Sequence, residues 1–261
     1  MDYQLRDRVV LVTGGARGIG FAAAAMFAAE GAKLVLVDIN GAAAEAAAAR
    51  LVAAGGNAIG LGVDITSRDQ CTAMVARVER ELGPIGVAVN SAALLDDKTF
   101  LESSSADWTR IVDVCLYGAM NVLHAVLPGM VERKFGRIVC MASDSARLGQ
   151  ARLSYYAAAK AGVIALVKSV AQEVGGAGVT LNVVSPGATN TELRKDREAG
   201  LLAGMGEEKY ARRVKAVLKM YPAGRIGEPD DIARAILFLS SASASWVTGQ
   251  VLSVNGGFTM P

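Results

Sequence analysis

Residues 9–20 read Val-Val-Leu-Val-Thr-Gly-Gly-Ala-Arg-Gly-Ile-Gly. The first five residues form a short apolar run rich in β-branched side chains, which is typical of a buried strand, and the glycines that follow indicate a tight loop. Residues 19–30 then favour a helix that ends at Gly31. This stretch therefore predicts a strand, a glycine-rich loop and a helix in succession.

Strand-like and helix-like segments alternate along the rest of the chain. We expect further strands at residues 33–37, 57–63, 87–90, 138–141, 179–184 and 250–254, and helices at residues 42–54, 67–82, 107–133, from about 154, and 228–240. Alternation of this kind is typical of parallel strands joined by crossover helices. The sequence thus predicts a Rossmann-type α/β fold, a doubly wound parallel sheet of about seven strands with helices on both faces. No repeat or linker divides the chain, which predicts a single domain over residues 1–261.

Composition and charge argue against several classes of function. The net charge is only +2 and the basic residues are spread along the chain, so nucleic acid is not an expected partner. No apolar run reaches the roughly 18 residues of a membrane span, and residues 1–8 are polar, so we expect a cytoplasmic protein with no membrane partner. Cys71, Cys115 and Cys140 lack metal-ligand spacing and His124 is the only histidine, so no metal site is expected.

The glycine loop and an acidic residue after the second strand predict a dinucleotide site. Gly14, Gly18 and Gly20 would let the backbone approach a pyrophosphate at the N-terminus of the first helix. Asp38 ends the second strand 20 residues after Gly18, where its carboxylate would accept hydrogen bonds from ribose hydroxyls and repel a 2′-phosphate. Arg17 could instead meet a 2′-phosphate, so NADP stays open as the alternative. The carboxylate favours NAD as the cofactor.

Residues 137–160 contain candidate chemical groups. Ser143 follows the predicted strand at residues 138–141, and Tyr156 and Lys160 are four residues apart on an alanine-rich helix, so they share one face. An ammonium beside a phenol favours the phenolate, and we therefore expect Lys160 to lower the pKa of Tyr156 from its usual value near 10. Tyr156 is a candidate general acid or base, and Ser143 could bind the same substrate oxygen.

The glycine loop and the Ser-Tyr-Lys set occur together with several smaller motifs. In chain order, the set comprises residues 13–20, Asp64, Asn90, Ser143, Tyr156, Lys160 and Pro186-Gly187. In this combination the chain resembles the short-chain dehydrogenase/reductase family from about Leu5 to Gly257. The resemblance implies that Tyr156 exchanges a proton with the substrate oxygen, that Ser143 orients this oxygen, and that Lys160 also binds the nicotinamide ribose. It further implies a nicotinamide dinucleotide cofactor and a homotetramer.

The resemblance also assigns cofactor contacts and shows one departure from the family. The further contacts implied are Arg17 and Ile19 in the glycine loop, Asp64 and Ile65 beside the adenine, Asn90 and Ala92 after the fourth strand, and Pro186, Gly187 and Thr191 on the nicotinamide side. The family has a fourth catalytic residue, an asparagine seven positions after a tryptophan, and counting from Trp108 gives Cys115. Because the family asparagine acts largely through its main-chain carbonyl, we expect the proton relay to persist in altered form.

The segment 188–221 is expected to form a lid of two short helices that selects the substrate. It holds eight Lys and Arg residues against five Asp and Glu residues, which suggests an anionic substrate, although solvated helix faces give the same excess. Arg147 and Arg152, which flank the loop after Ser143, add slightly to this suggestion.

Three runs, residues 124–133, 142–144 and 249–254, resemble a branch of the family that oxidises ring alcohols, that of 2-hydroxycyclohexanecarboxyl-CoA dehydrogenase. The expected function is hydride transfer between NAD(H) and a secondary alcohol or ketone, on a cyclic hydroxy acid, a dihydrodiol or its CoA thioester. Two alternatives remain. One is an NADPH-dependent 3-oxoacyl thioester reductase, and the other is a non-catalytic cofactor-binding regulator.

Overall fold

Within residues 3–260, which the computed structural model describes, seven parallel strands form one sheet. They are β1 (Val9–Thr13), β2 (Lys33–Asp38), β3 (Asn57–Gly62), β4 (Ile85–Asn90), β5 (Gly136–Met141), β6 (Val179–Pro186) and β7 (Val251–Val254). Their spatial order is β3-β2-β1-β4-β5-β6-β7, so the order reverses between β1 and β4. Ligands bind at such a switch point, beyond the carboxyl ends of the strands. The predicted Rossmann-type fold is confirmed.

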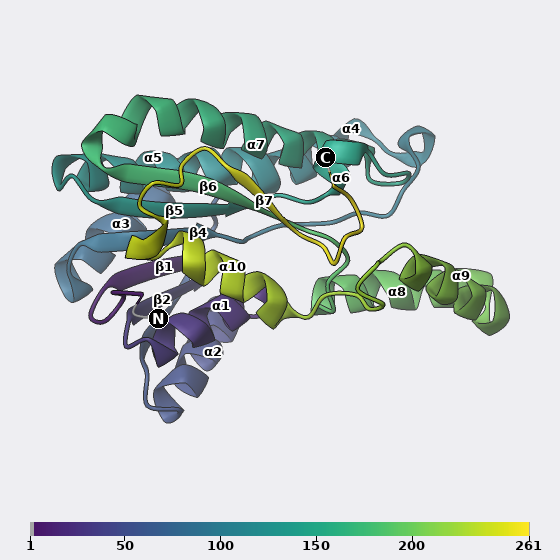
Figure 1. Ribbon diagram of the computed structural model, residues 1–261, viewed down its shortest axis with the longest axis horizontal. Helices are drawn as coiled ribbons and strands as arrows, with labels where there is room; N and C mark the ends of the chain where they lie inside the picture. The colour runs from purple at the N-terminus through teal and green to yellow at the C-terminus, as the bar shows by residue number, and fades with distance from the viewer. Residues whose placement is uncertain (1–2, 261) are drawn as a thin grey trace.

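Three helices, α1 (Gly18–Ala29), α2 (Gly41–Ala53) and α10 (Pro229–Leu239), cover one face of the sheet (Figure 1). Phe27 of α1, Leu36 of β2 and Ile236 of α10 belong to the apolar core that they enclose. Alanine-rich α2 lies very close to β3. The distance shows this, since a Cβ added to Gly60 would stand only 2.3 Å from the carbonyl carbon of Ala44. Small residues on both elements permit this approach.

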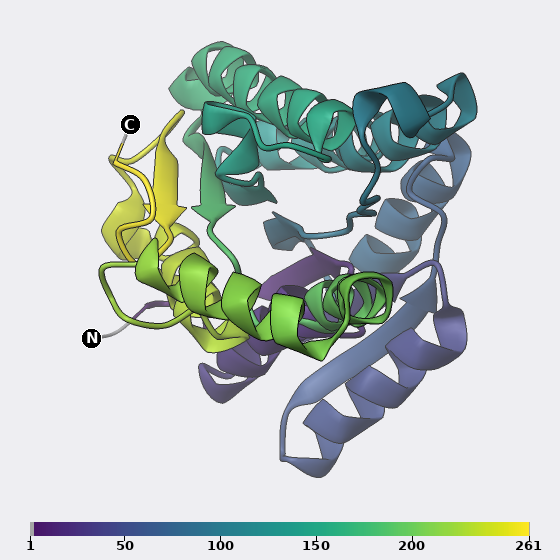
Figure 2. The same cartoon turned by 90° about the vertical axis from the view of Figure 1, so that its right-hand side faces the viewer.

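The helices α3 (Arg68–Leu82), α5 (Gly118–Glu132) and α7 (Ser154–Val174) cover the opposite face, and Figure 2 shows the sheet between the two layers. Met74, Val122 and Val163, one from each helix, belong to a second core cluster that includes Leu11 of β1. The inner strands β1, β4, β5 and β6 are buried on both faces and have nearly continuous apolar runs, which is why their positions could be predicted from the sequence.

The helix predicted at residues 107–133 is a continuous run of three parts. These are α4 (Ser105–Val112), a π-helical turn η2 (Asp113–Tyr117) and α5. This run of 28 residues is long and apolar enough to cross a membrane by length and composition, since an 18-residue window within it has a mean hydropathy of 1.5. Polar residues such as Asp113, Asn121 and His124 interrupt the run, so it contains no uninterrupted apolar stretch of 18 residues. In this fold, Val122, Leu123 and Val126 of the run are buried in the core beside α3 and α7.

Two helices, α8 (Glu192–Met205) and α9 (Glu207–Lys219), extend beyond the carboxyl ends of the strands, at the right of Figure 1. They are the two helices predicted for residues 188–221, and we call them the lid. Thr191 caps α8 by accepting a hydrogen bond from the Arg194 N–H, and Gly206, with a φ of +78°, separates the two helices. Single turns were not predicted: α6 (Ser145–Leu148), η1 (Phe100–Glu102), η3 (Gly175–Ala177) and η4 (Ala242–Ala244).

Candidate active site

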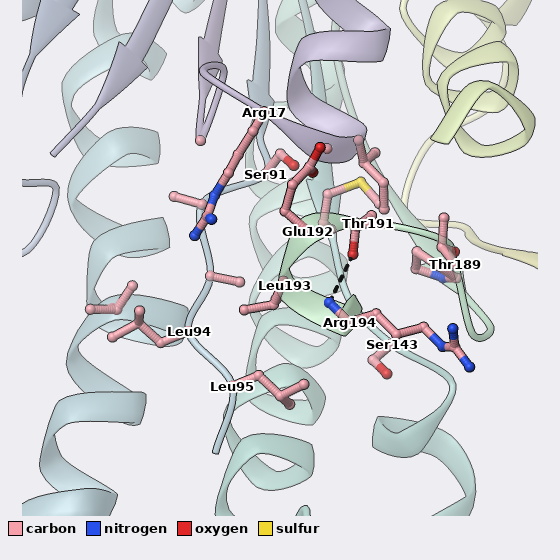
Figure 3. Close-up of a pocket in the computed structure, with 18 of the residues that line it drawn as sticks. Arg17, Ser91, Leu94, Leu95, Ser143, Thr189, Thr191, Glu192, Leu193 and Arg194 are labelled. Atoms are coloured by element: carbon pink, nitrogen blue, oxygen red, sulfur yellow. Dashed lines mark hydrogen bonds between the residues drawn. The ribbon is translucent and has the colours of Figure 1, made fainter. Parts of the chain in front are cut away.

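One cavity of about 380 Å³ lies at the carboxyl ends of β1, β2, β4, β5 and β6, beneath the lid (Figure 3). It gathers most of the residues singled out in the sequence. Those that line it are Gly14, Arg17, Gly18, Ile19, Asp38, Asp64, Ile65, Ala92, Ser143, Tyr156, Lys160, Pro186, Gly187 and Thr191. The doubly wound topology thus brings together side chains that are far apart in the chain.

The glycine loop forms a cradle that a side chain would fill. Gly14 and Gly18 adopt left-handed φ angles of +62° and +57°, and a Cβ on Gly14 would lie 2.8 Å from the Ala92 backbone. Gly20 does not line the cavity. A Cβ there would lie 2.2 Å from the Gly14 carbonyl oxygen, so Gly20 allows the loop to pack on α1.

The N-terminus of α1 is suited to an anion. Arg17 precedes the helix without a side-chain hydrogen bond to its first turn, and this turn contains no acidic residue. Its backbone N–H groups and the positive end of the helix dipole therefore lie at the cavity wall, where Glu192 Oε2 of the lid would stand 3.5 Å from a Cβ added to Gly18. This arrangement fits the pyrophosphate of a dinucleotide, which would lie against Gly14, Gly18 and Ile19.

Two carboxylates mark the side where an adenosine would lie. Asp38, at the end of β2, accepts a hydrogen bond of 3.1 Å from the Asn40 N–H. Asp64 accepts hydrogen bonds from the N–H and hydroxyl of Thr66, at 2.9 and 2.8 Å, which orders the turn after β3. Arg17 is 4.0 Å from Asp196 of the lid, and since both side chains are exposed this ion pair contributes little.

Ser143, Tyr156 and Lys160 meet on the cavity wall, as predicted. The Ser143 hydroxyl accepts a hydrogen bond from the Ser145 hydroxyl at 2.9 Å. Lys160 is only 1% exposed, and its Nζ donates a hydrogen bond of 2.8 Å to the Met141 carbonyl oxygen. The same Nζ is 5.9 Å from the centre of the Tyr156 ring.

The structure corrects the expected pKa of Tyr156. Burial is the largest influence and raises the pKa of the phenol above its usual value, and the nearby Cys115 adds to this effect. A hydrogen bond with Ser143 lowers the pKa but does not reverse the direction, so the lowering expected from Lys160 is not seen. Tyr156 is therefore a neutral phenol at ordinary pH, which is the form that donates a proton.

Cys115 lies in the π-helical turn between α4 and α5. Its buried thiol donates a hydrogen bond of 3.5 Å to the carbonyl oxygen of Leu94, and its side chain packs in a cluster with Tyr155 and Tyr156. A π-helical turn alters the backbone hydrogen bonding of a helix and frequently accompanies functional sites. The thiol thus supports the cavity-lining loop after β4, and the altered relay stays a prediction.

Asn90 supports the switch point from outside the cavity. The Thr13 hydroxyl at the end of β1 donates a hydrogen bond of 2.7 Å to Asn90 Oδ1 at the end of β4, and both side chains are buried. The loop at residues 91–95 is consequently fixed against the glycine loop. Thr13 was not assigned a role from the sequence, although its position before Gly14 could have suggested one.

Asp144 was also missed in the sequence. Its buried carboxylate accepts a hydrogen bond of 2.8 Å from the Ser185 hydroxyl and another of 2.6 Å from the Asn255 side chain. These bonds join the ends of β5, β6 and β7 beside Ser143. The only signal in the sequence was its place directly after that serine.

Comparisons with known proteins agree with this geometry. A family model described as enoyl-(acyl carrier protein) reductase matches residues 14–259. The chain is 36% identical to a 3-oxoacyl-[acyl-carrier-protein] reductase of Chlamydia muridarum, over 98% of this chain and 99% of that protein. It is 38% identical to an acetoacetyl-CoA reductase of Shinella zoogloeoides, over 96% and 98%. It is also 36% identical to 2-(S)-hydroxypropyl-CoM dehydrogenase 3 of Xanthobacter autotrophicus, over 99% of each chain.

Proposed function

Because the chain belongs to the short-chain dehydrogenase/reductase family of oxidoreductases, we propose that it interconverts a 3-oxoacyl thioester and the corresponding 3-hydroxyacyl thioester with NAD(H). The observation that carries this proposal is the convergence of Ser143, Tyr156 and Lys160 on one cavity beside the glycine cradle. Leu94, Leu95 and Leu193 supply apolar lining, which suits an acyl chain (Figure 3). The homotetramer, the cytoplasmic location and the expected absence of nucleic-acid and membrane partners stay predictions.

The names of two of the relatives favour a thioester substrate over a ring alcohol. Both the 3-oxoacyl-[acyl-carrier-protein] reductase and the acetoacetyl-CoA reductase are named for 3-oxoacyl thioesters. This class therefore replaces the cyclic hydroxy acids that the sequence favoured.

The chemistry follows from the protonation state of Tyr156. When bound, the nicotinamide supplies the hydride that reaches the carbonyl carbon in reduction, or accepts it in oxidation. Ser143 orients the substrate oxygen, and neutral Tyr156 transfers its hydroxyl proton to that oxygen in reduction. In oxidation Tyr156 takes this proton back. The buried ammonium of Lys160, held by the Met141 carbonyl, places a positive charge near the phenolate that forms when the proton leaves.

We expect the enzyme to reduce acetoacetyl-CoA with NADH. The rate is measured as the loss of NADH absorbance. The comparison substrate is the CoA thioester of 2-oxocyclohexanecarboxylate. Acetoacetyl-CoA should have a kcat/KM about tenfold higher, because an apolar group that fits or does not fit an apolar pocket changes kcat/KM by about this factor. A higher value for the cyclic thioester would return the assignment to the ring-alcohol branch. Absence of turnover with both would favour the non-catalytic regulator.

Asp38 should make NADH the preferred cofactor over NADPH. Its carboxylate lines the cavity at the end of β2, where it would repel a 2′-phosphate. Replacing Asp38 with Asn keeps hydrogen-bonding groups and removes the charge, so the NADH to NADPH ratio of kcat/KM should fall about tenfold. Glu45→Gln removes an exposed charge from α2 outside the cavity and should leave the ratio unchanged. A wild-type enzyme that prefers NADPH would contradict the assignment.

A further inference from the structure

Asp97, in the loop after β4, joins two arginines that come from different parts of the fold. Arg197 of α8 donates a hydrogen bond of 2.5 Å from Nε to one carboxylate oxygen. Arg152, in the loop before α7, donates from Nε to the other oxygen and from Nη2 to the Asp97 carbonyl at 2.8 Å. Burial opposes ionisation of Asp97, yet the two arginines hold the pKa of its carboxyl below the usual range.

This cluster lies where α8 of the lid meets the loop after β4 and the loop before α7. Arg197 lines the cavity and is only 16% exposed in its side chain. Arg152 is four residues before Tyr156 and has a left-handed φ of +68°, which is unfavourable for a residue with a Cβ. The cavity-lining Leu94 and Leu95 belong to the same loop as Asp97. A change in charge at Asp97 would therefore be felt at the mouth of the substrate cavity.

The charges of the cluster cancel. Arg152 also lies 3.5 Å from Glu102, so two guanidinium groups face the carboxylates of Asp97 and Glu102. The other lid arginine that lines the cavity, Arg194, lies 3.5 Å from buried Glu198. Glu198 is also bound by Arg213 at 2.8 Å. Each of the two lid arginines that line the cavity thus already faces an acidic residue of the same chain, and Asp97 is the one that holds Arg197.

We propose that Asp97 is a specificity-determining residue. Its carboxylate occupies Arg197 and Arg152 and so prevents them from binding a negatively charged group of a substrate. The wild-type cavity consequently takes 3-oxoacyl groups whose carboxyl is uncharged, as in a thioester or ester, and discriminates against the free 3-oxo acids. This inference rests on the proposed function, since it names the class of substrate for the same site.

The test compares acetoacetate with its ethyl ester, which share the 3-oxobutanoyl group and differ in charge. Binding is measured by calorimetry in the presence of NAD⁺, where ligand and cofactor are both oxidised and no turnover occurs. Asp97→Asn leaves Arg197 without its counter-charge, so acetoacetate should bind about tenfold more tightly than to wild type, as expected for a charge-assisted contact. The affinity for ethyl acetoacetate should stay within about threefold.

Unchanged or weaker binding of acetoacetate by Asp97→Asn would overturn the proposal. An equal gain for both ligands would also overturn it, because that result indicates a general opening of the mouth. Adding Arg197→Met to Asp97→Asn removes the released charge and should restore the wild-type discrimination. Since the readout is binding, it stays separate from the turnover of acetoacetyl-CoA that tests the proposed function.

Two more variants complete the experiment. Glu208→Gln removes the partner of Arg212 on α9, in an ion pair where Arg212 is 69% and Glu208 87% exposed. This variant should change neither the affinity for acetoacetate nor that for ethyl acetoacetate. Glu102→Gln removes the second, exposed carboxylate of the cluster and should tighten acetoacetate about threefold. If Asp97→Asn does not fold, Glu102→Gln decides alone, and an unchanged affinity for acetoacetate then overturns the proposal.

Discussion

Replacing Tyr156 with Phe is expected to lower kcat about a thousandfold, within the range observed for loss of a general acid or base. The phenol is the group that donates the proton to the substrate oxygen, and burial keeps it protonated. The ring itself packs against Cys115 and Tyr155 and would remain in place, so the fold should not change. Because the hydroxyl acts in the chemical step, the dissociation constant of NADH should stay within about twofold of wild type.

Steady-state reduction of acetoacetyl-CoA gives kcat, and quenching of protein fluorescence gives the NADH dissociation constant. Tyr155 offers a matched control on the same helix. Its hydroxyl donates a hydrogen bond of 3.3 Å to Asp96, away from the catalytic group, so Tyr155→Phe should keep kcat within about threefold. A Tyr156→Phe enzyme with more than about a tenth of the wild-type kcat would refute the general-acid role. Equal inactivity of the Tyr155 variant would point to a structural effect on α7.

The fold could be predicted from the sequence because its signals are local. The strand at Val9–Thr13 and the helix at Gly41–Ala53 are encoded by runs of β-branched residues and of alanines, and the structure places both where they were expected. The π-helical turn at Asp113–Tyr117 has no comparable signal. It arises inside a helical pattern, where the sequence favours an uninterrupted helix.

Most members of the candidate site could be predicted from the sequence, although Thr13 and Asp144 were missed and Gly20 and Asn90 lie outside the cavity. Its electrostatics could not be predicted. Spacing placed Ser143, Tyr156 and Lys160 together, and the structure gathers them on one cavity. The direction of the pKa shift was predicted incorrectly because it depends on burial, which a four-residue spacing does not reveal.

The partners of Asp97 were equally hidden in the sequence. Arg152 and Arg197 are 55 and 100 residues away from it in the chain, so a count of charges along the sequence could not show that they are neutralised. Local composition can predict that cations are present near a site. Only the tertiary fold shows whether they are available to a ligand.

Gly20→Ala is expected to weaken NADH binding at least about a hundredfold, although Gly20 does not touch the cavity. A Cβ there would lie 2.2 Å from the Gly14 carbonyl oxygen, 2.9 Å from its carbonyl carbon and 3.3 Å from the Cα of Gly15. All three atoms are backbone, so no side-chain rotation relieves the clash, and either the loop or α1 must move. Gly14 forms the floor of the cradle, and a displacement of about 1 Å is enough to lose a hundredfold in a positioned site.

The same variant should also be less stable, by about 1–3 kcal/mol, because forcing a methyl group into a packed contact costs this much. Chemical denaturation gives the free energy of unfolding, and calorimetry gives the NADH dissociation constant of the folded enzyme. Gly200→Ala on α8 is the matched control, because a Cβ there meets nothing within 4 Å, and alanine favours a helix. The control should bind NADH as wild type does. If Gly20→Ala also bound NADH within about threefold of wild type, the glycine loop would be able to accommodate the methyl group. The close contact between Gly20 and the Gly14 carbonyl would then not determine the conformation of the glycine loop.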